Sequence, residues 1–123
     1  MHVNRLEQDE ETIRRTLQNG ARLVACLCAE WCSSCRAWQD EFAALARQYP
    51  DDCFVWIDIE DHPELVAEID FEIFPVLLIQ NEDVLSFLGP VKPVPAVVAT
   101  LLQRAHPARA TFDDPGIFAS LSA

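Results

Sequence analysis

The sequence predicts a domain of the α/β class, in which helices sandwich a mixed central β-sheet. Two observations carry this prediction. Stretches rich in β-formers alternate with stretches of helical periodicity, in the order β-α-β-α-β-α-β-β-α. The 123 residues are 50% hydrophobic and 24% charged, which is typical of a globular domain that buries its own core. We expect the domain to occupy residues 1–105, followed by a C-terminal extension over residues 106–123.

The first elements are a short strand over residues 3–6 and a helix that Asp9 caps. Ile13 and Leu17 lie four residues apart on one face of this helix, and Gly20 ends it. Residues 23–29 are then uninterruptedly apolar, as in a strand buried on both faces at the centre of a sheet.

A long helix follows over residues 33–49, and Pro50 ends it. Its apolar residues form a helical stripe: Cys35, Trp38, Phe42, Leu45, Ala46 and Tyr49. Residues 53–57 form a second buried strand, which is parallel to the first if the helix between them is a crossover.

Three further elements and a tail complete the chain. Pro63 fits the first turn of a short helix, which carries Leu65, Val66 and Ile69. Residues 76–79 and 84–88 are expected to form an antiparallel hairpin around the turn 81–83. Pro95 opens a last helix, with an apolar face of Val94, Val97, Val98, Leu101, Leu102 and Ala105. The extension contains apolar residues that we expect to dock on the domain or on a second copy through a short helix begun by residues 113–115: Phe112, Ile117, Phe118 and Leu121.

Charge and length exclude several function classes. Twenty acidic residues face nine Lys and Arg, for a net charge of −11, which repels phosphate backbones and anionic lipids. We therefore expect no nucleic-acid and no membrane partner. The longest apolar run, residues 23–29, is far below the roughly 18 residues of a membrane span. The acidic N-terminus lacks the apolar core of a secretory signal, so we expect a cytoplasmic protein.

The stretch AEWCSSC over residues 29–35 carries the chemistry, because a strand precedes it and a helix follows it. Cys32 falls at the helix N-terminus, where free backbone N–H groups and the helix dipole favour the thiolate, the nucleophile of thiol–disulfide exchange. Cys35 lies one turn deeper, within reach of Cys32 but shielded, so it can resolve a mixed disulfide formed at Cys32. Trp31 places a flat apolar side chain beside the sulfur.

Three other interpretations of the two cysteines remain open at this point. They are half of a zinc site, a structural disulfide, or a chance spacing of buried thiols. Zinc needs four ligands, and the sequence has no second CxxC and only scattered histidines, so we expect no metal. A disulfide that closes so short a loop adds little stability, and five cysteines are an odd number for a disulfide scaffold.

Three motifs in this order resemble the thioredoxin family: EWCSSC (30–35) after an apolar strand, IFPVLLI (73–79) and FLGP (87–90). The resemblance covers about residues 3–105 and implies a thioredoxin fold and a protein-disulfide oxidoreductase of cell redox homeostasis. It implies that Cys32 is the attacking cysteine and Cys35 the resolving one. It further implies a substrate-binding surface, made by Trp31, Phe74, the cis-proline Pro75 and Gly89.

The chain departs from the family pattern at several positions. Ser33 and Ser34 stand between the cysteines, where thioredoxins proper have Gly-Pro, so we expect a reductant or a weak isomerase rather than a strong oxidant. Cys26 replaces the family's buried acid and is expected to modulate the reaction, while Trp56 takes the place of the accompanying lysine. The simplest interpretation is that all the remaining cysteines, Cys26, Cys28 and Cys53, are small buried hydrophobic residues.

The predicted function is the reduction of protein disulfides through Cys32 and Cys35, with a reductase such as thioredoxin reductase as the electron donor. No bound cofactor is expected, because the cysteines carry the electrons. A groove edged by Glu30, Asp58, Glu60 and Asp61 would disfavour the thiolate and repel acidic partners. The alternative function is a peptide-binding or chaperone-like module with little redox turnover.

Overall fold

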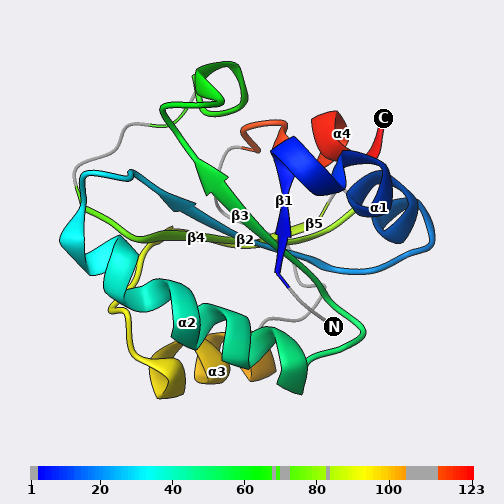
Figure 1. Cartoon of the computed structure of the whole chain (residues 1–123). Helices are drawn as coiled ribbons and strands as arrows, with labels where there is room; N and C mark the ends of the chain where they lie inside the picture. Colours follow the sequence, from blue (N-terminus) through cyan, green and yellow to red (C-terminus); the bar gives the residue numbers. More distant parts are fainter. Residues whose placement is uncertain (1–2, 68, 70–72, 83, 105–113) are drawn as a thin grey trace.

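A five-stranded mixed sheet lies between two helical layers in the computed structural model, which describes residues 3–67, 69, 73–82, 84–104 and 114–123 (Figure 1). The strand order is β1-β3-β2-β4-β5. The strands are β1 (Asn4–Arg5), β2 (Leu23–Cys28), β3 (Cys53–Asp58), β4 (Val76–Asn81) and β5 (Val84–Pro90). The helices are α1 (Leu6–Gln18), α2 (Ser33–Gln48), the 3-10 turn η1 (Pro63–Leu65), α3 (Pro95–Arg104) and α4 (Ile117–Ser122). This architecture confirms the predicted fold class.

The parallel pairing of β2 with β3 and the hairpin of β4 and β5 agree with the sequence prediction, which did not address the pairing of β2 with β4. β2 runs parallel to β3 and antiparallel to β4, and β4 and β5 form an antiparallel hairpin. All six residues of β2 are buried, because this central strand has neighbours on both sides and helices over both faces. Alternate side chains of β2 therefore enter two different apolar clusters.

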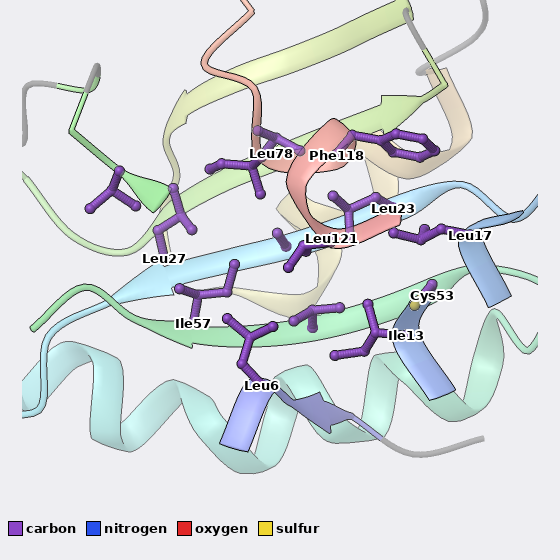
Figure 2. Packing of buried hydrophobic residues seen from close by; sticks show 14 of the residues in the cluster. Leu6, Ile13, Leu17, Leu23, Leu27, Cys53, Ile57, Leu78, Phe118 and Leu121 are labelled. Atoms are coloured by element: carbon purple, nitrogen blue, oxygen red, sulfur yellow. The ribbon is translucent and has the colours of Figure 1, made fainter. Parts of the chain in front are cut away.

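The two clusters form the core on either face of the sheet. The first lies under α1 and α4 and includes Leu23, Ala25 and Leu27 of β2. The second lies under α2 and α3 and includes Val24, Cys26 and Cys28 of the same strand. Figure 2 shows the first cluster, in which Phe118 and Leu121 of α4 approach Leu23 and Leu78 of the sheet.

α4 packs on the chain's own α1 and closes the first cluster (Figure 1). Ile117, Phe118 and Leu121 are buried. Polar contacts fasten both ends of the segment: the Gln80 amide donates to the Asp114 carboxylate at 2.9 Å, and Arg14 Nε donates to the Ala123 carbonyl at 2.8 Å. The helix begins at Ile117, later than the expected start, and Phe112 and Asp113 lie outside the described residues.

Two predicted elements differ in the structure. α1 begins at Leu6, and Asp9 lies inside it at a kink (φ −122°, ψ 20°) rather than capping its start. The Asp9 carboxylate instead reaches back and accepts a hydrogen bond from the Arg5 N–H at 2.9 Å. The expected short helix after Pro63 is, among the described positions, a 3-10 turn of three residues that ends at Leu65, before Val66 and Ile69.

The predicted apolar face of the last helix is only partly buried. Val98 and Leu102 of α3 pack under α2, whereas Val94 and Val97 are 44% and 36% exposed. Ala105 lies outside the described residues. Fewer residues of α3 contact the sheet than the number of its apolar residues suggests. A helix of about three turns presents only one or two residues per turn to a flat surface.

Candidate active site

The strand register brings the segments of the candidate site to one edge of the sheet. Cys28, the last residue of β2, pairs with Asp58 at the end of β3. On the other side Leu27 pairs with Val76, the first residue of the antiparallel strand β4. Pro75 therefore enters the sheet beside the point where the chain leaves β2 for the CxxC segment. Gly89 follows on β5, where it pairs with Leu77.

Cys32 is the N-cap residue of α2 and is partly exposed. Its extended backbone (φ −84°, ψ 115°) ends the loop, and its carbonyl accepts the first helical hydrogen bond from the Arg36 N–H at 3.2 Å. Desolvation raises the pKa of the Cys32 thiol, but the backbone groups of Cys35 and Ser34, the Cys35 thiol and the Arg36 charge together outweigh it, so the pKa lies below the ordinary thiol value. Cys32 is thus the thiol most readily ionised at this site.

Cys35 lies one turn into α2 and is 1% exposed. Burial raises the pKa of its thiol well above the ordinary range, and the neighbouring Cys28 thiol raises it further. Ser33 and Ser34, between the two cysteines, are exposed residues of the first turn of α2. The two cysteines therefore differ in exposure and in the direction of their pKa shifts: Cys32 is partly exposed with a lowered pKa, and Cys35 is buried with a raised one.

An aromatic and proline surface stands beside Cys32. The peptide bond between Phe74 and Pro75 is cis, and Pro75 is buried. The Trp31 and Phe74 rings meet edge to face, with centroids 5.6 Å apart and an interplanar angle of 86°. Trp31 is nevertheless 64% exposed, so an apolar face remains free for a partner. A side chain at Gly89 would touch only the Phe87 ring, at 3.7 Å.

Cys26 and Cys28 lie on one face of β2, as the period of a strand requires, and both are buried under α2. Their Sγ atoms are 3.6 Å apart. Cys28 also interacts with Cys35, which the sequence analysis missed because it treated Cys28 as one more small hydrophobic residue. The signal was available in the spacing, since Cys28 is two residues nearer than Cys26 to the end of the strand, where the CxxC segment begins.

A pocket of about 500 Å³ lies beside Cys35. Cys28 and Cys35 line it, together with Trp56, which pairs with Cys26 across the sheet. Its polar rim carries both signs of charge: Arg5, Arg36, Glu30, Asp58 and Asp61. Three of the four acids expected around the groove thus line this pocket, and Glu60 is not among the lining residues.

The remaining candidates lie apart from this site. Cys53 is buried in the opposite cluster under α1, where burial raises its pKa to about 11 despite a hydrogen bond from Asn4. His62 lies before η1, with Nδ1 3.8 Å from the Glu64 carboxylate. Among the described residues no group of three or more His, Cys, Asp or Glu is arranged to hold a metal ion. In the same ranges no helix is long and apolar enough to cross a membrane.

The arrangement can carry out two-electron thiol chemistry. A partly exposed thiol of lowered pKa can attack a disulfide, and a second thiol one helical turn away can attack the resulting mixed disulfide. The exposed Trp31 and the chain around Pro75 offer a surface for the disulfide's carrier.

Comparison with known proteins gives a consistent result. The family model described as Thioredoxin matches residues 4–98. Thioredoxin H5 of Oryza sativa subsp. japonica is 32% identical over 82 residues, which cover 65% of this chain and 61% of that protein. Putative thioredoxin H10 of Arabidopsis thaliana is 34% identical over 76 residues, covering 62% of this chain and 49% of that protein. The match therefore spans about half to three fifths of these relatives.

Solved structures resemble the fold at lower identity. A poplar thioredoxin h superimposes with a TM-score of 0.68 at 18% identity, over 86% of this chain and 100% of that chain. Fasciola hepatica thioredoxin gives a TM-score of 0.67 at 20% identity, over 86% and 100% of the two chains.

Proposed function

The chain belongs to the thioredoxin family and has its fold, and from this premise we propose that it is a thiol–disulfide oxidoreductase that reduces protein disulfides. The observation that carries the proposal is the contrast in exposure and pKa between Cys32 and Cys35, which lie within one helical turn of each other. Cys32 has a lowered pKa and is partly exposed, whereas Cys35 has a raised pKa and is buried.

The reaction proceeds in two exchanges. The Cys32 thiolate attacks one sulfur of the substrate disulfide; a Cys32–substrate bond forms, and the other substrate sulfur leaves as a thiolate. The Cys35 thiol then loses its proton and attacks Cys32 Sγ. The Cys32–Cys35 disulfide forms, and the second substrate sulfur departs with its electron pair. The substrate gains two electrons, which the two protein cysteines supply.

Substrate binding is assigned to the surface beside Cys32. An extended substrate segment would lie along the backbone at Phe74 and Pro75, as a peptide does when it pairs with exposed main chain. Trp31 would cover its apolar side chains, and Gly89 leaves room at the edge of the sheet. Ser33 and Ser34 are small, so they leave Cys32 accessible from solvent.

The electron donor is proposed from the relatives. The solved complex of a ferredoxin:thioredoxin reductase with thioredoxin f2 shows a protein of this fold bound to a reductase. For this chain we propose a dedicated reductase, such as a thioredoxin reductase, that returns the Cys32–Cys35 disulfide to the dithiol. The cytoplasmic compartment stays part of the proposal.

The test is the reduction of insulin with dithiothreitol as the donor. Wild-type protein should accelerate it, Cys32→Ser should abolish the acceleration, and Cys35→Ser should accumulate mixed disulfides that run as a larger species without reductant. Cys53→Ser is the matched control, because Cys53 lies on the opposite face of the sheet. Insulin reduction by Cys32→Ser at the wild-type rate would refute the proposed function. Peptide binding that Cys32→Ser leaves intact, without turnover in the wild type, would favour the peptide-binding module.

A further inference from the structure

Four of the five cysteines gather around the end of β2 and the start of α2. Cys26, Cys28 and Cys35 belong to one buried cluster, and Cys32 packs against it. The sulfurs of Cys26 and Cys28 are 3.6 Å apart. The Cys35 thiol interacts with the thiols of Cys28 and Cys32, and Cys28 and Cys35 line the same pocket. The proposed exchange uses only Cys32 and Cys35, so two adjacent thiols are left without a role.

Strand geometry decides which of these thiols can form another disulfide. Cys26 and Cys28 are residues i and i+2 of an extended strand, so their backbones lie about 6.6 Å apart and their Cβ atoms point in parallel. A disulfide needs Cβ atoms about 3.5–4.5 Å apart, which a flat strand does not provide. Cys28 and Cys35 lie on different elements, β2 and α2, belong to one buried cluster and line the same pocket, so this restriction does not apply to them.

We propose that Cys28 is a second exchange partner of Cys35. It converts the Cys32–Cys35 disulfide into a buried Cys28–Cys35 disulfide and sets Cys32 free. This inference rests on the proposed function, because the Cys32–Cys35 disulfide is the product of substrate reduction.

The step balances within the protein. The Cys28 thiol loses its proton, and its sulfur attacks Cys35 Sγ. The Cys28–Cys35 bond forms, and the Cys35–Cys32 bond breaks. The electron pair leaves with Cys32 as a thiolate, and the proton is released through the pocket that Cys28 and Cys35 both line. No external oxidant or reductant is needed, because the number of disulfides does not change.

The environments of the three sulfurs set the direction and the pace. Cys32 is the best leaving group of the three, because its thiolate is stabilised at the start of α2. The hydrogen bond with Cys26 and burial raise the pKa of Cys28 far above the ordinary range, so its thiolate is scarce and the exchange is slow. The product is a disulfide between two thiols that ionise poorly, and such disulfides resist reduction because their dithiol form gains no thiolate stabilisation.

The functional consequence is an oxidised form that captures partners. With Cys35 bound to Cys28, the free Cys32 thiolate can still attack a substrate disulfide, but no Cys35 thiol is available to resolve the product. The substrate then stays covalently attached until Cys35 is reduced. Protein with the Cys32–Cys35 disulfide would be ready for its reductase. Protein with the Cys28–Cys35 disulfide would instead bind a substrate covalently through Cys32.

The experiment maps disulfides in the wild-type protein after brief oxidation with diamide. After removal of the diamide, samples are taken over minutes to hours, the timescale of uncatalysed disulfide rearrangement. Free thiols are blocked at low pH with N-ethylmaleimide. Cleavage after Arg and Glu separates residues 23–30, which hold Cys26 and Cys28, from residues 31–36, which hold Cys32 and Cys35. A Cys32–Cys35 disulfide leaves the two peptides apart, and a Cys28–Cys35 disulfide joins them.

The expected result is that the joined peptides rise about tenfold after the diamide is removed, with Cys26 and Cys32 carrying the maleimide label. Cys32→Ser isolates the new pair: four cysteines remain, and diamide should consume two of them as the same joined peptides. The joined peptides should persist in Cys53→Ser/Cys32→Ser and vanish in Cys28→Ala/Cys32→Ser.

Three results would overturn the inference. They are joined peptides that never form in the wild type, four unconsumed thiols in Cys32→Ser, and joined peptides in which Cys26 carries the link. These outcomes are independent of the insulin assay. If the joined peptides form but insulin is not reduced, only the proposed function is refuted. If insulin is reduced but the joined peptides do not form, only this inference is refuted.

Discussion

At the scale of single residues, the position of each sulfur relative to α2 decides its reactivity. Cys32 has free backbone N–H groups of the first turn beside it, so its thiolate is stabilised. Cys35 and Cys53 have no such advantage, because burial disfavours their charged forms.

Alkylation should therefore single out Cys32. Iodoacetamide reacts with thiolates, so the rate at Cys32 should fall as the pH drops through its lowered pKa, with a midpoint below that of a free thiol such as glutathione. Cys53, with a pKa raised to about 11, should stay slow from neutral to mildly alkaline pH and serves as the internal control. Peptide mass spectrometry after brief labelling reports both sites, and equal labelling of Cys53 at pH 7 would contradict the assignment.

Position 26 should limit the resolving step. A carboxylate at position 26 would accept the proton that Cys35 loses, which reaches it through the Cys28 thiol between them. Cys26→Asp should therefore speed insulin reduction. An ionised carboxylate in a buried strand should also cost stability, on the order of several kcal/mol. Cys26→Asn is the matched control, with a similar shape and no proton acceptor of comparable strength. Turnover and the denaturant midpoint are measured together, and equal turnover in both variants would show that another group takes the proton.

At the scale of elements, α4 contributes to the core of a domain that otherwise ends with α3. The buried residues of α4 give it the role of a structural element. A domain boundary near residue 105 remains a prediction.

Ile117→Ala should destabilise the protein by about 2–5 kcal/mol, because the fully buried side chain would leave a cavity between α4 and the sheet. Ser120→Ala, on the exposed side of the same helix, should change the free energy of unfolding by less than about 0.5 kcal/mol. Urea unfolding followed by Trp fluorescence measures both. An unaffected midpoint for Ile117→Ala would mean that α4 does not stay on α1 in solution.

At the scale of the whole molecule, we expect the charge of −11 to favour basic partners over acidic ones. Glu30, Asp58 and Asp61 place part of this charge close to the cysteines. A negative field attracts basic substrates and repels acidic ones, and salt screens it over about 8 Å at physiological ionic strength.

Reduction rates should therefore depend on salt with opposite signs for the two kinds of substrate. Between about 10 and 150 mM salt, a basic disulfide protein should be reduced up to about tenfold more slowly as salt rises, and an acidic one faster. The initial rate of thiol release at each salt concentration measures this. Salt effects of the same sign on both substrates would show that long-range charge has no part in selection.

The sheet and its central strands could be predicted from the sequence, and the sequence also predicts where the thiol chemistry lies. Uninterrupted apolar runs required strands covered on both faces, and the helix start after residues 29–32 required two cysteines of unequal reactivity. These inferences hold because burial and helix-end effects are local, so the chain carries them in adjacent residues.

Which distant residues meet depends on how the elements pack, and the sequence did not predict it. The start of α1, the short turn at Pro63 and the exposure of Val97 depend on what packs against each segment. The spacing places Cys28 near the CxxC segment, but its contact with Cys35 depends on how α2 packs over β2. Packing brings together segments that are separate in the sequence. It makes Cys28, which the sequence suggests is only a small buried residue, a neighbour of the reactive pair.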